Sequence, residues 1–231
     1  MLSDSLNAID WQQNIKSSLS FETTEADIQQ AALRIAVWSK QLEILDSGNP
    51  ALSFIREMQI SIQNSGALIA LCLYKASAAS SRALVETCLY YTYFRTHPSE
   101  LSTLINDPKF YVSKKDIIDY HRVHTSHFKI NSEALNFTSD LELWYSKISA
   151  VIHGQIPGAW NAHTNLNQIS FSKKTHKLAI QTLLQGEKLA HYCLLTTVAK
   201  EMWAGFAPDA KAHLLKGLTG QAKATIGLDA K

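Results

Sequence analysis

Apolar residues recur every three or four positions along most of this chain, and residues that form tight turns are scarce. Only nine Gly and five Pro occur among 231 residues, too few for an all-β protein with many tight turns. The pattern predicts an all-α fold, a single-domain bundle of about seven or eight helices over residues 1–231. Because 46% of the residues are hydrophobic, including five Trp, the chain can form a sizeable core.

The expected helices are separated by short breaks that contain polar residues, Gly or Pro. The long ones are predicted at 5–19, 24–45, 51–64, 67–95, 113–128, 140–152 and 176–204, with short ones at 99–106 and 208–217. Ser65 and Gly66 are expected to interrupt the helical pattern, and 131–139 to form a polar connector. The segment 155–175 is the least helical, with a short strand at 168–172, and the tail from Gly220 is expected to fray.

The N-terminal residues and the hydropathy pattern predict a cytoplasmic protein that does not enter the membrane. No basic segment followed by an apolar core marks a signal peptide at the N-terminus. The most apolar run, 66–74, is far shorter than the roughly 20 residues of a membrane span. Cys72, Cys88 and Cys193 are odd in number and lie far apart among apolar residues, so we expect buried free thiols.

Charge is unevenly distributed along the chain. Residues 173–231 carry nine Lys and four acidic residues, a balance of +5, whereas residues 1–172 carry 13 Lys and Arg and 16 acidic residues, a balance of −3. A basic C-terminal third is compatible with an RNA or phosphate partner. Solvated helix faces are the simpler explanation of the same pattern.

A polar stripe crosses the apolar helix expected at 67–95. Lys75, Arg82, Glu86 and Tyr90 follow one another at helical spacing, so they lie near one face. A buried charge is costly unless it is paired, which makes Arg82 and Glu86 either a structural ion pair or part of a pocket wall. Lys75 and Tyr90 extend the stripe and are candidate substrate-binding residues.

The helix expected at 140–152 has a second polar stripe, opposite its apolar face. Ser146 and Ser149 are candidate substrate-binding residues on it, and His153 stands in its last turn before Gly154. The negative end of the helix dipole stabilises an imidazolium at such a position. Packing of the two helices is predicted to bring Arg82, Glu86 and His153 into one polar site.

The two stripes together resemble a known family. The stretches SRALVETCLYYTYF and YSKISAVIHG are similar to the two characteristic helices of HEPN proteins, in a group associated with bacterial defence, and the resemblance covers about 66–155. The HEPN signature is an Arg, four to six intervening residues and a His near a helix end. Lys147 and His153 have that spacing here, with Lys147 in place of the Arg. Arg82 is therefore the alternative source of a guanidinium.

The resemblance implies a HEPN-like core at about 66–204, a homodimer, and RNA as a substrate that is cleaved without metal. His153 would act as general acid or base, Arg82 or Lys147 would stabilise charge on the phosphate, and Glu86 would orient them. A toxin or antiphage system with a partner protein is the expected context. The alternatives are a non-catalytic binding module or subunit of a larger complex, and a nucleotide-binding bundle in which Arg82 holds a phosphate.

Three further histidines, His121, His124 and His127, are spaced three residues apart. At this spacing they fan across a wide sector of a helix, so one metal ion would not face all three. A solvated or anion-attracting face is the favoured interpretation. Because glycine-rich phosphate loops, nucleophile elbows and HExxH motifs are also missing from the sequence, neither a metal nor a cofactor is expected.

Overall fold

The computed structural model describes the chain except for residues 157, 159, 161–162 and 230–231. Helix accounts for 75% of the described residues, and none of them lies in a strand. The expected all-α class is confirmed. The described residues form thirteen α-helices and two short 3-10 helices, more than the seven or eight expected, because several predicted helices are divided by tight turns.

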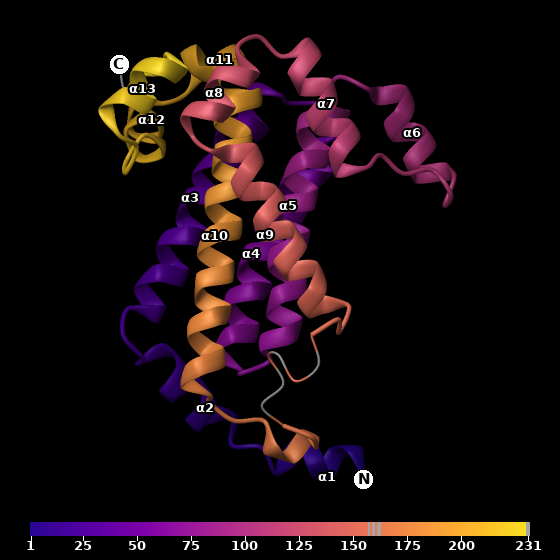
Figure 1. Ribbon diagram of the computed structural model, residues 1–231, viewed down its shortest axis with the longest axis vertical. Coiled ribbons are helices and arrows are strands. Elements are labelled where there is room, and N and C mark those ends of the chain that lie inside the picture. The colour runs from indigo at the N-terminus through magenta and orange to yellow at the C-terminus, as the bar shows by residue number, and fades with distance from the viewer. Residues whose placement is uncertain (157, 159, 161–162, 230–231) are drawn as a thin grey trace.

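Five long helices run side by side and form the body of the molecule (Figure 1). They are α3 (Thr24–Leu45), α4 (Leu52–Ala70), α5 (Tyr74–Phe94), α9 (Phe137–Ile152) and α10 (Lys173–Thr197). Helix α5 is central in this arrangement, since it packs against α4, α9 and α10. The polar stripe on α5 therefore has a neighbouring helix on several sides.

Shorter helices lie at the two ends of the long ones (Figure 1). One end holds α1 (Leu2–Asn7), α2 (Trp11–Leu19) and η1 (Leu166–Gln168). The other holds α6 (Pro98–Asn106), α7 (Lys114–His124), α8 (Phe128–Ala134), α11 (Ala199–Met202), η2 (Trp203–Gly205), α12 (Pro208–Leu214) and α13 (Gly220–Ile226). Helix α7 also packs against α5 and brings its first turn close to the central polar stripe.

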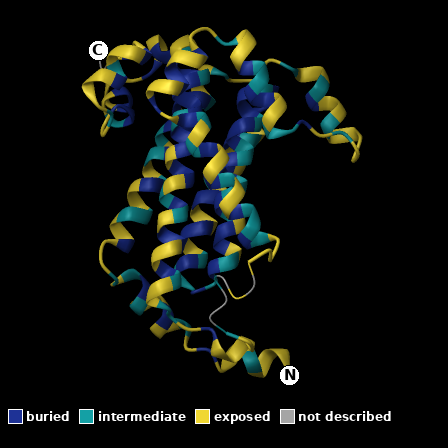
Figure 2. Ribbon diagram, in the orientation of Figure 1, coloured by how far each residue is buried: buried dark blue, intermediate teal, exposed yellow. Residues whose placement is uncertain are grey.

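The core fills the space between the long helices, where Figure 2 shows buried residues facing inward. Fully buried side chains from four of these helices meet there: Ile35, Trp38, Leu42, Ile55, Met58, Ile62, Leu84, Cys88, Leu183 and Leu194. The three cysteines are buried free thiols, as expected from the sequence. Burial raises the pKa of the Cys72 and Cys88 thiols, so neither provides a thiolate nucleophile at neutral pH.

A buried polar network ties α3 to α10. The indole Nε1 of Trp38 donates to Nδ1 of His191 over 2.9 Å, and Arg34 lies 3.2 Å from Glu187. Burial raises the pKa of the Glu187 carboxyl to about 7, although Arg34 acts in the opposite direction. These contacts pair two of the polar residues that helix α10 carries into the core, Glu187 and His191, with residues of α3.

Helix α9 ends as the sequence predicts. Gly154 has a φ of +68°, and the amides of Gly154 and Gln155 donate back to the carbonyls of Val151 and Ala150. Left-handed backbone of this kind closes many helices and favours glycine. The turn fixes His153 as the residue that caps α9.

The expected break at Ser65 and Gly66 is wrong, and the helix predicted at 67–95 is divided elsewhere. Helix α4 continues to Ala70, and the chain turns at Cys72, whose φ is +61°. Gly66 serves close packing instead, because a Cβ at this position would lie 2.6 Å from Cγ2 of Ile28. The small residue lets α3 approach α4.

Other expected boundaries also differ from the structure. The helix predicted at 5–19 is divided before Asp10, whose carboxylate caps α2 by accepting from the amide of Gln13. The helix predicted at 113–128 ends at His124, and the connector predicted at 131–139 contains parts of α8 and α9. The expected strand at 168–172 is absent from these described residues, and the tail from Gly220 forms α13, capped by Thr219. Part of the segment 155–175 lies outside the described residues.

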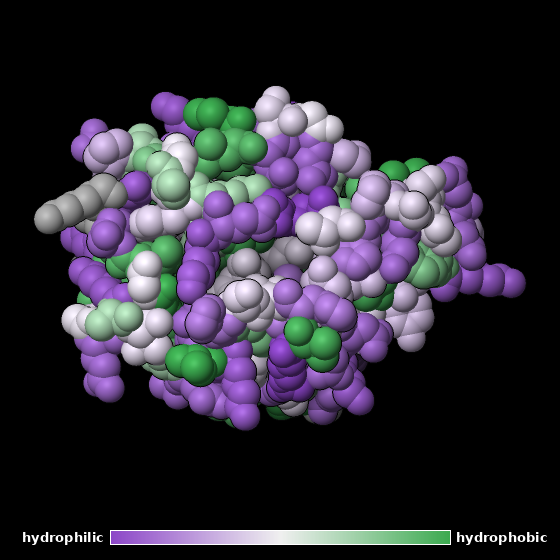
Figure 3. Space-filling model, turned by 90° about the horizontal axis from the view of Figure 1, so that it is seen from above, coloured by the Kyte–Doolittle hydropathy of each residue, from purple (hydrophilic) through white to green (hydrophobic). Residues whose placement is uncertain are grey.

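The end of the molecule that Figure 3 presents is mainly polar. Figure 3 shows one end of the molecule, on which hydrophilic residues dominate and hydrophobic ones form small separate patches. Among the described residues, no helix combines the length and the apolar composition needed to cross a bilayer.

Candidate functional site

Arg82 joins the two polar stripes that the sequence singled out. Its Nε donates to Oε1 of Glu86 over 2.9 Å, one turn further along α5. Its Nη1 lies 3.2 Å from Nε2 of His153, at the end of α9. The predicted convergence of Arg82, Glu86 and His153 is therefore present in the structure, while their chemical roles stay predictions.

Tyr145 on α9 completes this cluster. Its hydroxyl accepts from Nη2 of Arg82 over 2.7 Å and donates to Oε1 of Glu86 over 2.5 Å. Burial and the neighbouring carboxylate raise the pKa of Tyr145 to about 12, so the hydroxyl remains a donor at neutral pH. Tyr145 was missing from the site expected from the sequence, although its spacing of four residues from Ser149 places it on the same stripe.

The contacts of Arg82 fix a positive charge at the edge of the bundle. Burial opposes the charged form, but Glu86 and Tyr145 outweigh it and raise the pKa of the guanidinium. The side chain of Arg82 is 21% exposed and that of Glu86 is 36% exposed, so both groups are held while part of each still faces solvent. Paired in this way, the two charges on α5 escape the high cost of an isolated buried ion.

His153 presents the reactive group of the cluster to solvent. The residue is exposed, and its backbone amide donates to Ser149 at the end of α9. Arg82 has only donor groups, so Nε2 of a neutral His153 is the acceptor in this contact and Nδ1 carries the proton. In this tautomer the lone pair of Nε2 is directed at Nη1 of Arg82.

The remaining sequence candidates are distributed around this cluster. Lys75 reaches the same end of α9, since its Nζ lies 3.9 Å from the place that a Cβ on Gly154 would occupy. Tyr90 lies one turn beyond Glu86 and lines the pocket described below. Lys75 and Tyr90 therefore flank the cluster along α5, on opposite sides of Arg82.

The other candidates on α9 show no contact with the cluster. Ser146 and Lys147 are exposed, and the described residues provide neither with a hydrogen bond or an ion pair. Lys147 follows Tyr145 by two residues, which places it roughly 200° around the helix from the tyrosine that faces Arg82. The hydroxyl of Ser149 is buried without a partner among the described residues. The proposed roles of these three residues stay predictions.

A pocket of about 270 Å³ opens beside the cluster, between α5, α9 and the beginning of α7. It is lined by Arg82, Glu86, Leu89, Tyr90, Tyr111, Val112, Ser113, Lys114, Ile117 and Tyr145. Nζ of Lys114 pairs with Glu142 at 2.6 Å and lies 4.8 Å from the centre of the Tyr145 ring. Lys114 is thus a second cationic group, besides Arg82, next to the ring of Tyr145.

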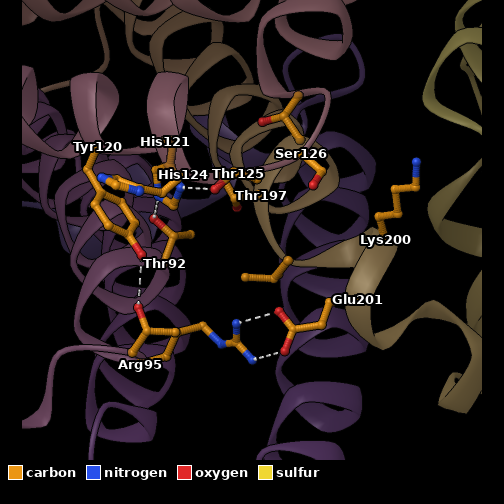
Figure 4. A pocket seen from close by; sticks show the side chains of 13 residues that line it. Thr92, Arg95, Tyr120, His121, His124, Thr125, Ser126, Thr197, Lys200 and Glu201 are labelled. Carbon is orange, nitrogen blue, oxygen red and sulfur yellow. Dashed lines mark hydrogen bonds and ion pairs between the residues drawn. The ribbon is translucent and has the colours of Figure 1, made fainter.

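A second pocket, of about 400 Å³, lies where α5, α7 and α10 end (Figure 4). His121 sits between two hydroxyls, with Nε2 3.0 Å from Oγ1 of Thr92 and Nδ1 2.8 Å from Oγ1 of Thr125. Figure 4 also shows Arg95 and Glu201 as a bidentate pair, with N–O distances of 2.9 and 3.1 Å. His121, Arg95 and Glu201 are therefore each bonded to another residue that lines this pocket.

The structure buries His121, so the solvated face expected for the three histidines is wrong for this residue, while His124 and His127 are exposed. Because Thr92 donates its hydroxyl proton to the Leu89 carbonyl, it accepts from Nε2 of His121, and Thr125 donates to Nδ1. Burial, with smaller contributions from His97 and Arg95, lowers the pKa of His121 to about 4. Among the described residues, no group of three His, Cys, Asp or Glu side chains is arranged to hold a metal ion.

Comparisons of this chain with protein-family models, with curated proteins and with solved structures give no match. The interpretation of the site therefore depends on its own geometry and chemistry.

Proposed function

We propose that this protein is a HEPN-like ribonuclease that cleaves RNA without a metal ion at the cluster of Arg82, Glu86, Tyr145 and His153. The contact of 3.2 Å between Nη1 of Arg82 and Nε2 of His153 supports this proposal most directly. It joins an oriented guanidinium, which can stabilise charge on a phosphate, to an exposed imidazole, which can act as a general base.

The reaction would be an attack by the ribose 2′-hydroxyl on the adjacent phosphorus. The phosphate replaces His153 as the acceptor from Nη1 of Arg82, which frees the lone pair of Nε2. Nε2 of His153 then takes the hydroxyl proton, the 2′-oxygen bonds to phosphorus, and the bond to the 5′-oxygen breaks. Arg82 stabilises the charge that develops on the phosphate oxygens. The departing 5′-oxygen takes a proton from Lys75 or from water, which leaves a 2′,3′-cyclic phosphate and a 5′-hydroxyl.

Glu86 and Tyr145 would act by holding Arg82 in place. Both contact the guanidinium at Nε and Nη2, and this leaves Nη1 directed at His153. A guanidinium that is already oriented loses little conformational freedom when a phosphate binds. Lys114 and the basic C-terminal third of the chain would add attraction for the RNA backbone.

We expect His153→Ala to reduce RNA cleavage by at least about 100-fold, the usual contribution of a general acid or base. Because His153 is exposed at a helix end, the melting temperature should change little. The measurement compares wild type and variant on a labelled single-stranded RNA in the presence of a chelator. Leu143→Ala, a change at a residue of α9 that is 55% exposed, is the matched control for truncation of a side chain there.

Equal cleavage by the wild type and His153→Ala would contradict the proposed role of His153. Binding of RNA without cleavage by the wild type would instead favour the non-catalytic binding module. The homodimer, the partner protein and the toxin or antiphage context remain predictions that follow from the HEPN resemblance.

A further inference from the structure

An aromatic pocket adjoins the cluster and is lined by Arg82, Glu86 and Tyr145 but not by His153. Its floor is apolar, since Leu89, Val112 and Ile117 are all at most 8% exposed. Its volume of about 270 Å³ is just below the range of about 300–1,000 Å³ that is usual for sites of drug-sized ligands. A space of this size suits one flat ring system and excludes a longer stretch of nucleic acid.

Tyrosines form the walls of the pocket. Tyr90 projects from α5, while Tyr111 comes from the segment that precedes α7 and is 74% exposed. The described residues provide no hydrogen bond to either hydroxyl. An aromatic side chain as exposed as Tyr111 contributes little to the core, so its ring is available to a ligand.

Cationic groups form the rim nearest the cluster. Lys114 is only 16% exposed and is held by Glu142. Arg82, paired with Glu86, lies 4.7 Å from the centre of the Tyr145 ring. An apolar, aromatic floor with cations along one edge matches a planar base that is attached to a phosphate. The edge with Arg82 is shared with the cluster, so a ligand in the pocket would extend from it.

We propose that this pocket binds one unpaired nucleobase of a single-stranded RNA, next to the phosphate that Arg82 contacts. The inference rests on the proposed function, because it takes the Arg82 cluster as the phosphate site. Stacking on Tyr111 holds the base, and Lys114 contacts the following phosphate. A base within a duplex cannot enter, since its faces are covered by its neighbours and its edge is paired.

Binding of a short fluorescent oligonucleotide tests the pocket separately from cleavage. The probe is a single-stranded pentanucleotide in which every sugar is 2′-deoxy, so that the 2′-hydroxyl needed for the proposed cleavage is missing. Affinity is measured by fluorescence anisotropy at low salt, where phosphate contacts are strongest. Wild type is compared with Tyr111→Ala, with Tyr111→Phe, which keeps the ring, and with Ile105→Ala, a truncation on α6 at a residue that is 73% exposed.

We expect Tyr111→Ala to weaken binding by about tenfold or more, the usual effect of removing one stacking partner. Tyr111→Phe and Ile105→Ala should remain within about twofold of the wild type. A probe that lacks the one base that enters the pocket should bind the wild type as weakly as the intact probe binds Tyr111→Ala. Equal losses in Tyr111→Ala and Ile105→Ala, or no binding by the wild type, would overturn the inference.

The outcome for the pocket can be separated from the outcome for the reaction. If binding depends on Tyr111 but the corresponding RNA is not cleaved, the base pocket stands and the nuclease proposal fails. If RNA is cleaved but Tyr111→Ala binds and cleaves as the wild type does, the nuclease proposal stands and the base pocket fails.

Discussion

Replacement of Arg82 by Ala is expected to lower the rate of RNA cleavage by about 100-fold to 1,000-fold, the usual loss when a fixed charge-stabilising donor is removed. The guanidinium donates to Glu86 and Tyr145 and also contacts His153. No other described side chain makes these three contacts, so none can replace Arg82 in the site. Single-turnover rates with saturating RNA would measure the loss at the chemical step.

Arg82→Lys is the informative companion variant. A single ammonium cannot contact Glu86, Tyr145 and His153 in the way that three guanidinium nitrogens do, so charge alone should restore little activity. Tyr145→Phe keeps the ring but removes the hydroxyl that joins Arg82 to Glu86, and we expect an intermediate loss of about tenfold. Full activity in Arg82→Lys would show that the orientation of the cationic group by Glu86 on α5 and Tyr145 on α9 is unimportant for cleavage.

Acidification should destabilise the protein by ~3 kcal/mol through His121 alone. Burial lowers the pKa of His121 from an ordinary 6.5 to about 4 in the folded state. Between these values the unfolded chain binds more protons than the folded one. The stability contributed by neutral His121 is therefore complete above about pH 6.5 and is lost as the pH falls toward 4.

Urea unfolding at pH 7 and pH 4 tests this expectation, with His121→Gln as the comparison. Glutamine can still donate and accept between Thr92 and Thr125 but does not titrate. Between pH 7 and pH 4 the free energy of unfolding should fall by ~3 kcal/mol more in the wild type than in His121→Gln. Because His176 and Glu187 titrate in both proteins, their contributions cancel in the difference. An equal pH dependence of the free energy of unfolding in the two proteins would refute the claim that His121 is the source of this loss.

Local signals in the sequence were sufficient for much of the helical pattern. The end of α9 could be predicted because Gly154 is a local stop signal, and α3 because an apolar period of 3.6 runs through it. The predicted break at Gly66 was wrong because a glycine that permits close packing cannot be distinguished in the sequence from one that ends a helix. The turn at Cys72 carries no glycine or proline, so tertiary packing sets its place.

The core of the site could also be predicted, and its surroundings could not. Arg82 and Glu86 share a helix face, and the apolar face of α9 determines which way His153 points. The pocket beside them depends on where α7 and the segment with Tyr111 pack, which is a non-local property of the fold. Tyr145 was missed, although it lies on the polar stripe with Ser149, because a tyrosine in an amphipathic helix usually signals core packing.

The most direct test of the central claim is cleavage in a chelator of two RNAs that differ by one oxygen atom. One carries a ribose at the mapped cleavage position, and the other a 2′-deoxyribose there. The proposed reaction at Arg82 and His153 predicts that only the first is cut at this position, with a 2′,3′-cyclic phosphate on the product. Cleavage of both at the same rate, or an intact ribose-containing RNA, would contradict it.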